Sequence, residues 1–382
     1  AWPGDPARSE VTARLGVGEL PHVSGPLLLA AMPVAGNRLT GHFNGKMDRP
    51  RLFGRALNGD ELLALEHGDS PQSWPGGLIA AWDFAQEIST NRIVDTGPRS
   101  LHGTAVNMPA RGMTGANWTG DESNFRHAPQ EYGAIHFHED DLYDAGWQED
   151  FALEVPQDLK SGIYAARLRS GEDEDHIPFF VRPRKGQRKA GIAFLAPTAS
   201  YIAYANDANS FSSPGAQMVA GRLVVLQQQD LHLMVHPEYC ASLYDNHVDG
   251  SGICYSSRLR PILNLRPKYA SWLGAKGSGL WQFNADLHLT DWLERKGFDF
   301  DVITDEDLHA EGFDLLQGYR VVLTGSHPEY YSTRMLDAMT RYTREGGRLM
   351  YLGANGFYWR IGFHQSLPGV IEVRRAEDGS DL

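Results

Sequence analysis

The chain has 382 residues, 35 basic and 48 acidic, with a net charge of −13. This length predicts two or three domains, and the negative charge argues against nucleic acid or an anionic membrane as a partner, because both require a basic face. With only Cys240 and Cys254 there is no disulfide framework, so we expect buried thiols and a reducing cytoplasm. No apolar run approaches the ~20 residues of a membrane helix.

The first half of the sequence is typical of an all-β sandwich. Short apolar segments such as GLIAAWDF, YGAIHF and GIYAARL alternate with stretches rich in Gly, Pro, Asn and Asp. One helix is expected in LNGDELLALEHG, capped by Asn58 or Asp60 and ended by Gly68. The pieces HGTAVN and GHFNGKMDRPRLFGRALNGDELLAL resemble a laminin-G or concanavalin-like jelly roll. We therefore predict a jelly-roll region over residues 1–185, with a boundary in the basic stretch FFVRPRKGQRKAG.

The second half, residues 186–382, alternates strands with helices. The segments AGIAFLAP, DFDVITD, YRVVLTG and RLMYLGA are continuous apolar strands, and FNADLHLTDWLERKG has helical periodicity. A further helix in STRMLDAMTRYTREGG is capped by Ser332 and closed by Gly346. This alternation predicts an α/β domain with a doubly wound parallel sheet.

Ligands of such sheets bind outside the carboxyl ends of the strands. The strand YRVVLTG ends where SHPE begins, so His327 and Glu329 occupy a strand-to-helix loop. The strand AGIAFLAP runs out into TASYIAYAN, which places Tyr201 and Tyr204 at the same edge. Pro328 restricts the backbone and helps to aim His327.

The tetrapeptide HPEY also occurs earlier in the chain, with His236 and Glu238. This first copy lies in a polar loop, where an isolated histidine or glutamate is usually structural or solvated, so we interpret both as loop residues. The two copies share no other neighbours, which argues against a duplicated domain. The first copy leads into LYDNHVDGSGICYSSRLRP, a loop with enough polar groups and glycines to wrap around a site.

Two further motifs suggest metal binding. The segment DNHVDG supplies the first residues of a calcium loop, Asp245, Asp249 and Gly250. Its twelfth position is Ser256 instead of glutamate, which argues against calcium. The segment HFHEDD contains His136, His138 and Glu139, and strand alternation puts both histidines on one face; we favour a structural role there. No nucleophile elbow, Walker loop or dinucleotide fingerprint is present.

Residues 100–365 resemble the large subunit of N,N-dimethylformamidase. The resemblance rests on the segments WDF, YGAIHFHEDDL, SGIYAARL, IPFFVRP, YIAYAN, YDNHVDGSGICYSSRLRPILNLRP, WLERKGFDFDVITDEDLH and TGSHPEYYS. It implies hydrolysis of a small N,N-dialkylformamide to formate and a secondary amine by one iron ion, Fe3+, which is held by two tyrosines and a histidine. Carried onto this sequence, the implied ligands are Tyr204, Tyr244 and His327, with Glu329 as the essential glutamate.

The resemblance also implies a hetero-oligomer with a small subunit. Family members are about twice as long, so we expect the α/β domain to be incomplete at its C-terminus, with a further acidic residue beyond Leu382. The chemistry is coherent, because ferric iron is a hard ion and phenolate oxygens are hard ligands. Two tyrosinates leave a trivalent ion with net positive charge, which acts as a Lewis acid.

Other interpretations stay open. Without the resemblance, the implied ligands are two packed aromatics and a loop histidine. A hydrolase on a glutamine-amidotransferase-like sheet would carry a cysteine after the strand VVLTG, where this chain has Ser326 and His327. A carbohydrate-binding or scaffold protein would bind sugar and no metal. For an amidohydrolase, an apolar pocket is expected around the metal, with the candidates Phe211, Trp281 and Phe283.

Overall fold

The computed structural model describes residues 25–34, 38–68, 77–184, 187, 190–207, 225–239, 241–273 and 279–375. Phe211 and Cys240 lie outside the described residues. The chain divides into two compact units, Ala1–His42 and Phe43–Leu382. The described part of the first unit contains an antiparallel hairpin of β1 (Met32–Val34) and β2 (Arg38–Thr40). The remaining helices and strands all belong to the second unit.

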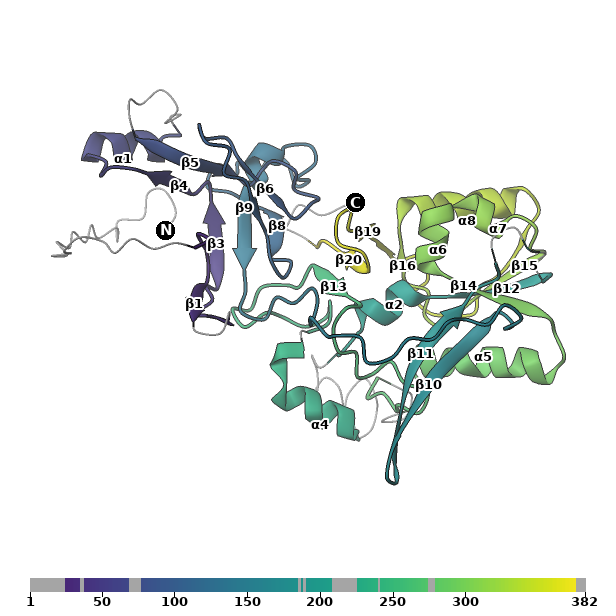
Figure 1. Cartoon of the computed structure of the whole chain (residues 1–382). Coiled ribbons are helices and arrows are strands. Elements are labelled where there is room, and N and C mark those ends of the chain that lie inside the picture. The colour runs from purple at the N-terminus through teal and green to yellow at the C-terminus, as the bar shows by residue number, and fades with distance from the viewer. Residues whose placement is uncertain are drawn as a thin grey trace. The chain divides into compact units, whose positions relative to one another are not determined.

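Two antiparallel sheets form the β-rich part of the second unit (Figure 1). One has the strand order β3-β9-β8, from β3 (Gly45–Asp48), β9 (Ala134–Phe137) and β8 (Ala110–Met113). The other has the order β4-β5-β6-β7, from β4 (Arg51–Phe53), β5 (Leu78–Asp83), β6 (Arg92–Asp95) and β7 (Gly103–Thr104). Both sheets contribute to one apolar core, made by Ala80, Trp82, Phe84, Ile93 and Ile135. A shared core is what a sandwich requires. The jelly-roll assignment stays a prediction.

The helix predicted in this region is confirmed as α1 (Gly59–Glu66). Asn58 Oδ1 accepts the backbone N–H of Glu61 at 2.9 Å, and the Glu61 carboxylate accepts the N–H of Asn58 at 2.9 Å. This reciprocal pair is a capping box, which satisfies two N–H groups that the helix itself leaves unpaired. Gly68 follows the helix with φ +91°, a conformation that favours glycine. A short 3-10 helix, η2 (Pro129–Tyr132), precedes β9.

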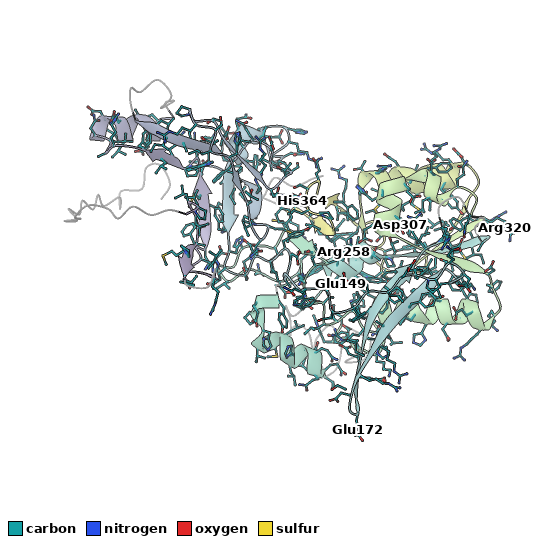
Figure 2. All side chains as sticks on the ribbon, in the orientation of Figure 1. Glu149, Glu172, Arg258, Asp307, Arg320 and His364 are labelled. Atoms are coloured by element: carbon teal, nitrogen blue, oxygen red, sulfur yellow. The ribbon has the colours of Figure 1, made fainter. Side chains whose placement is uncertain are left out.

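A long hairpin of β10 (Gly162–Ser170) and β11 (Asp173–Val181) follows the β-rich part. Gly171 has φ +61° in its two-residue turn, and Glu172 lies at the tip (Figure 2). At the other end, Ile163 and Phe180 pack into the apolar core of the following parallel sheet. The division of the chain at residues 185 and 186 stays a prediction.

The parallel sheet has the strand order β14-β12-β15-β17. Its strands are β14 (Phe300–Thr304), β12 (Ile192–Ala196), β15 (Val321–Thr324) and β17 (Arg348–Met350). The helices are α5 (Phe283–Arg295), α6 (Asp305–Glu311), α7 (Phe313–Leu316) and α8 (Thr333–Arg344). Side chains of α6, α7 and α8 pack with Ala193 and Leu195, whereas α5 packs with Phe194. Because successive strand residues point to opposite faces, helices cover both faces of the sheet. The glutamine-amidotransferase-like assignment stays a prediction.

The strand order reverses beside β12, since β14 and β15 flank it. This is the place where open α/β sheets bind ligands. There β12 leads into α2 (Thr198–Ala203), and β15 leads through a loop into β16 (Tyr330–Tyr331), which pairs with β18 (Trp359–Arg360). The remaining elements are α4 (Gln228–Val235), η3 (Pro237–Tyr239), β13 (Tyr255–Ser257), β19 (Gly362–Phe363) and β20 (Val370–Glu372). Within the described part of the chain, no helix combines the length and apolar character needed to cross a bilayer.

Candidate active site

The loop after β15 is held in place by contacts with α5 and α2. Asp286 of α5 accepts the N–H of Ser326, and Ser200 Oγ accepts the N–H of Glu329 at 3.1 Å. A Cβ atom at Gly325 would lie 2.5 Å from Asp286 Oδ2 and 2.6 Å from Pro197 Cδ, so the backbone can approach this closely only as glycine. The loop therefore directs the side chains that follow it toward the end of α2.

Four side chains named from the sequence meet at this point. Tyr204 Oη lies 2.7 Å from Tyr244 Oη and 2.8 Å from Glu329 Oε2. Tyr244 Oη lies 3.0 Å from Glu329 Oε1, and His327 Nε2 lies 2.8 Å from Glu329 Oε2 and 3.4 Å from Tyr204 Oη. We call Tyr204, Tyr244, His327 and Glu329 the tyrosine cluster. The exposed fractions of Tyr204, His327 and Glu329 are 8%, 3% and 2%.

Sequence reasoning missed Tyr330, which joins the cluster as a third phenol. Its O–H donates to Tyr244 Oη at 2.6 Å, and the side chain is fully buried. Tyr330 is the last residue of the second HPEY tetrapeptide, so the repeated motif was the signal that could have identified it. Tyr330 therefore adds a further hydrogen bond to the oxygen of Tyr244, beside those with Tyr204 and Glu329.

The phenols of the cluster are protonated unless a cation is present. Burial, together with the neighbouring phenols, raises the pKa of Tyr204 and of Tyr330 far above the usual value for tyrosine, and burial also raises the pKa of Tyr244. In this state the hydroxyls of Tyr204 and Tyr244 donate to the carboxylate of Glu329, and His327 Nε2 lies 2.8 Å from the same carboxylate.

The donor set of the cluster fits a hard, highly charged metal ion. Two phenol oxygens, a carboxylate and one imidazole nitrogen meet within hydrogen-bond distances, and all of them become anionic or neutral donors once their protons leave. His327 Nδ1 is buried and has no partner among the described residues, so Nε2 is the nitrogen that faces the cluster. Tyr204, Tyr244 and His327 are therefore suited to hold ferric iron.

Of the other candidates named from the sequence, Tyr201 and Phe283 lie outside the cluster, whereas Trp281 lies beside it. Tyr201, expected at the same edge as Tyr204, donates instead to Asp286 and packs with the ring of Phe283 at 5.6 Å. Phe283 therefore belongs to the core between α5 and the sheet. Trp281, in contrast, lies at the cluster, with its ring 4.7 Å from that of His327 and 5.9 Å from that of Tyr204.

The first HPEY copy is outside the cluster. His236 Nδ1 lies 2.6 Å from Glu238 Oε1, and the side chain of Glu238 is 61% exposed. Ser256, at the twelfth position of the calcium-like segment, donates its hydroxyl to the carbonyl of Ile202 at 2.7 Å. Cys254 is buried in a core of the β-rich part, away from the strand end where a nucleophile would be expected.

Comparison with known proteins identifies the family of this chain. Residues 110–380 match the model of a protein family that is described as "N,N-dimethylformamidase beta subunit-like, C-terminal". The chain belongs to this family. It is 48% identical over 340 residues to an N,N-dimethylformamidase beta subunit of Paracoccus aminophilus, and 45% identical to one of Alcaligenes sp. Each match covers 87% of this chain and 44% of the relative, so the chain spans less than half the length of these relatives.

Proposed function

We propose that this chain provides the metal ligands and the catalytic base of an iron-dependent amidohydrolase that acts on small N,N-dialkylformamides. The observation that carries the proposal is the convergence of Tyr204, Tyr244 and His327 on the carboxylate of Glu329, at the carboxyl edge of the parallel sheet. The substrate class comes from the name of the two relatives, N,N-dimethylformamidase beta subunit.

Iron held by Tyr204, Tyr244 and His327 would supply Lewis-acid charge to polarise the formyl group. Ionisation of the two phenols leaves both oxygens of Glu329 without the hydrogen bonds they accept from the protonated phenols. Glu329 then removes a proton from the water that attacks the formyl carbon, acting as a general base. The proton that it gains passes to the amide nitrogen as the C–N bond breaks, so that a secondary amine and formic acid, which ionises to formate, leave.

The surroundings of the cluster suit a small uncharged substrate. Trp281 forms an aromatic wall beside His327, and a flat apolar ring is a favourable surface for N-alkyl groups. The substrate class is therefore amides with small alkyl groups on nitrogen.

The proposal includes a partner and a fold assignment. The relatives are named beta subunits, which supports assembly with a small subunit in a hetero-oligomer. We further propose the jelly-roll architecture for the β-rich part and the glutamine-amidotransferase-like architecture for the parallel sheet. The cytoplasm stays the predicted location.

The test is metal analysis with a visible absorption spectrum, for the purified chain and for the longer assembly that corresponds to its relatives. Stoichiometric iron with a broad tyrosinate-to-iron charge-transfer band is expected in the wild type. Tyr204→Phe removes one ligand oxygen and should reduce iron content, the band and formamide hydrolysis together. A variant that keeps full iron and the wild-type band would exclude Tyr204 as a ligand.

A further inference from the structure

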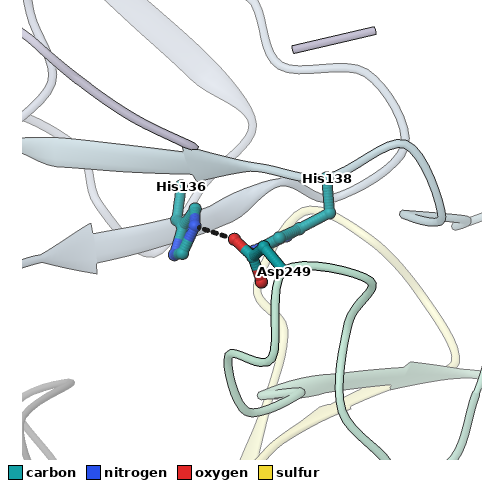
Figure 3. Close-up of side chains that lie close together, drawn as sticks. All are labelled: His136, His138 and Asp249. Carbon is teal, nitrogen blue, oxygen red and sulfur yellow. Dashed lines mark hydrogen bonds and ion pairs between the residues drawn. The ribbon is translucent and has the colours of Figure 1, made fainter. Parts of the chain in front are cut away.

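A second group of polar side chains lies where the end of β9 meets the loop 245–251. The group consists of His136, His138, His247, Asp140, Asp141 and Asp249. All three histidines are buried. Figure 3 shows His136 and His138 on one side of the strand, both facing Asp249, which confirms the face predicted from strand alternation. So many titratable groups in a buried place require an explanation, because each ionised form is costly there.

The charge of Asp249 is already compensated by its neighbours. Its carboxylate accepts from Ser251 Oγ at 2.6 Å, from Ser251 N–H at 2.9 Å and from His136 Nε2 at 2.7 Å. Although burial opposes this, the hydrogen bonds from Ser251 and His136 hold the pKa of Asp249 well below its usual range. A cation at Asp249 would therefore compete with donors that are already in place.

Asp141 is the carboxylate with the weakest compensation. Its side chain is only 11% exposed, and burial raises the pKa of Asp141 despite the hydrogen bonds from His138. Two imidazole nitrogens face its Oδ1 atom: His138 Nδ1 at 3.2 Å and His247 Nε2 at 4.0 Å. The two rings are stacked with their centroids 3.5 Å apart, so protonating both would place two cations in direct contact.

The other nitrogen of each ring already has a partner. His247 Nδ1 lies 2.7 Å from Asp140 Oδ1, and His138 Nε2 lies 3.0 Å from Ser251 Oγ. When His247 Nδ1 and His138 Nε2 each carry the ring proton, the unprotonated nitrogens are His247 Nε2 and His138 Nδ1. These are the two nitrogens nearest to Asp141 Oδ1. A histidine whose outer nitrogen is fixed by a carboxylate or hydroxyl while its inner nitrogen is unprotonated is prepared as a metal ligand.

We propose that His138, Asp141 and His247 bind a divalent transition-metal ion of the zinc class. Their three ligand atoms lie within 4.8 Å of one another. Two neutral imidazoles and one carboxylate are a donor set that suits zinc, which takes ligands at about 2.0–2.2 Å, so the side chains close in on the ion and leave their parallel stack. A cavity of about 10 Å³ borders Asp141 and His247, and the rest of its lining is mainly apolar.

The neighbouring set of His136, His138 and Asp249 meets the same distance limit. It is the weaker site, because the charge of Asp249 is already compensated by hydrogen bonds from Ser251 and His136. Glu139 takes part in neither set.

The proposed ion joins two segments that are distant in sequence. Asp141 and His138 follow β9, whereas His247 belongs to the loop that begins beside Tyr244. Bound zinc would thus hold this loop against the β-rich part. The inference is independent of the iron proposal, because the two sites share no ligand.

The experiment titrates the chelator-treated full chain with Zn2+ and with Co2+, whose visible spectrum reports nitrogen and oxygen ligands. We expect one tight equivalent in the wild type that is lost in His247→Gln and in Asp141→Asn. Asp140→Asn, which removes the negative charge beside His247 Nδ1 but keeps an acceptor oxygen, should weaken zinc binding roughly 10- to 100-fold. This variant keeps all three proposed ligands, so it tests the proposal even when the ligand variants do not fold.

Two control variants separate this site from its neighbours. His136→Gln should keep the zinc equivalent, and so should Tyr204→Phe, which affects only the tyrosine cluster. Undiminished zinc binding in both His247→Gln and Asp140→Asn would overturn the proposal. Loss of the ion in His136→Gln with retention in His247→Gln would also overturn it, since the ion would then belong to the neighbouring set.

Discussion

Replacement of Tyr330 by phenylalanine is the most specific test of the tyrosine cluster. The variant removes one hydroxyl, which donates to Tyr244 Oη at 2.6 Å, and it keeps the buried ring. In the metal-free chain Tyr244 Oη is a neutral acceptor, and it keeps its contacts with Tyr204 and Glu329. Loss of a neutral hydrogen bond of this kind costs about 0.5–1.5 kcal/mol, so the free energy of unfolding of the metal-free chain should fall by about that amount.

The iron-bound state should be affected more strongly. Tyr244 is then a phenolate, and a hydrogen bond to a charged acceptor contributes about 1.5–3 kcal/mol. The difference between the two states is about 1–2 kcal/mol. We therefore expect the affinity of the chain for ferric iron to fall roughly 5- to 30-fold in Tyr330→Phe.

The assay is competition for ferric iron against a chelator, followed by the tyrosinate charge-transfer band. Tyr331→Phe is the matched control, because Tyr331 is the next residue and equally buried, but its hydroxyl has no partner among the described residues. It should leave iron affinity unchanged. Equal iron affinity in Tyr330→Phe and wild type, or an equal loss in both variants, would refute the role assigned to Tyr330.

Two further predictions concern the same region. Glu329→Gln should retain iron, because the proposed ligands remain, but lower kcat by roughly 10²- to 10⁴-fold through loss of the base; a fully active variant would exclude that role. Burial raises the pKa of Asp286 from 3.8 to about 6 in the folded chain. As the pH rises, the unfolded chain therefore releases this proton before the folded chain does. The free energy of unfolding should fall as the pH rises from about 4 to about 6, by on the order of 3 kcal/mol. Asp286→Asn in the metal-free chain should remove that slope, as measured by urea unfolding at several pH values, and an unchanged slope would show that Asp286 is not the group that titrates.

Local signals in the sequence were sufficient for several helices and strands. Asn58 and Glu61 are three residues apart, and a capping box needs only that spacing, so the start of α1 could be predicted. Ser332 likewise caps α8, as predicted, by accepting the N–H of Met335. Apolar runs identified the buried strands β12, β14 and β15, because a strand covered on both faces has no polar alternation. The fourth run identified β17, which is the edge strand and is largely exposed.

The site could be predicted only where strand ends define it. Tyr204 and His327 each follow a strand of the sheet, so the rule on strand ends was enough to bring them together. Tyr201 lies in the same helix after β12, but its hydroxyl donates to Asp286 of α5 and not to the tyrosine cluster. Tyr244 follows no strand, and only the family resemblance identified it.

Long-range pairing explains why the partners of the two histidines of β9 and its end could not be predicted from the sequence. Alternation along β9 shows that His136 and His138 share a face. Their partners lie in the loop 245–251: Asp249 is 113 residues from His136, and Ser251 is 113 residues from His138. Nothing in the local sequence specifies that this loop returns to β9. Because the loop packs against the end of β9, this segment contributes a side chain to each cluster: Tyr244 to the tyrosine cluster, and His247, three residues later, to the group around Asp141.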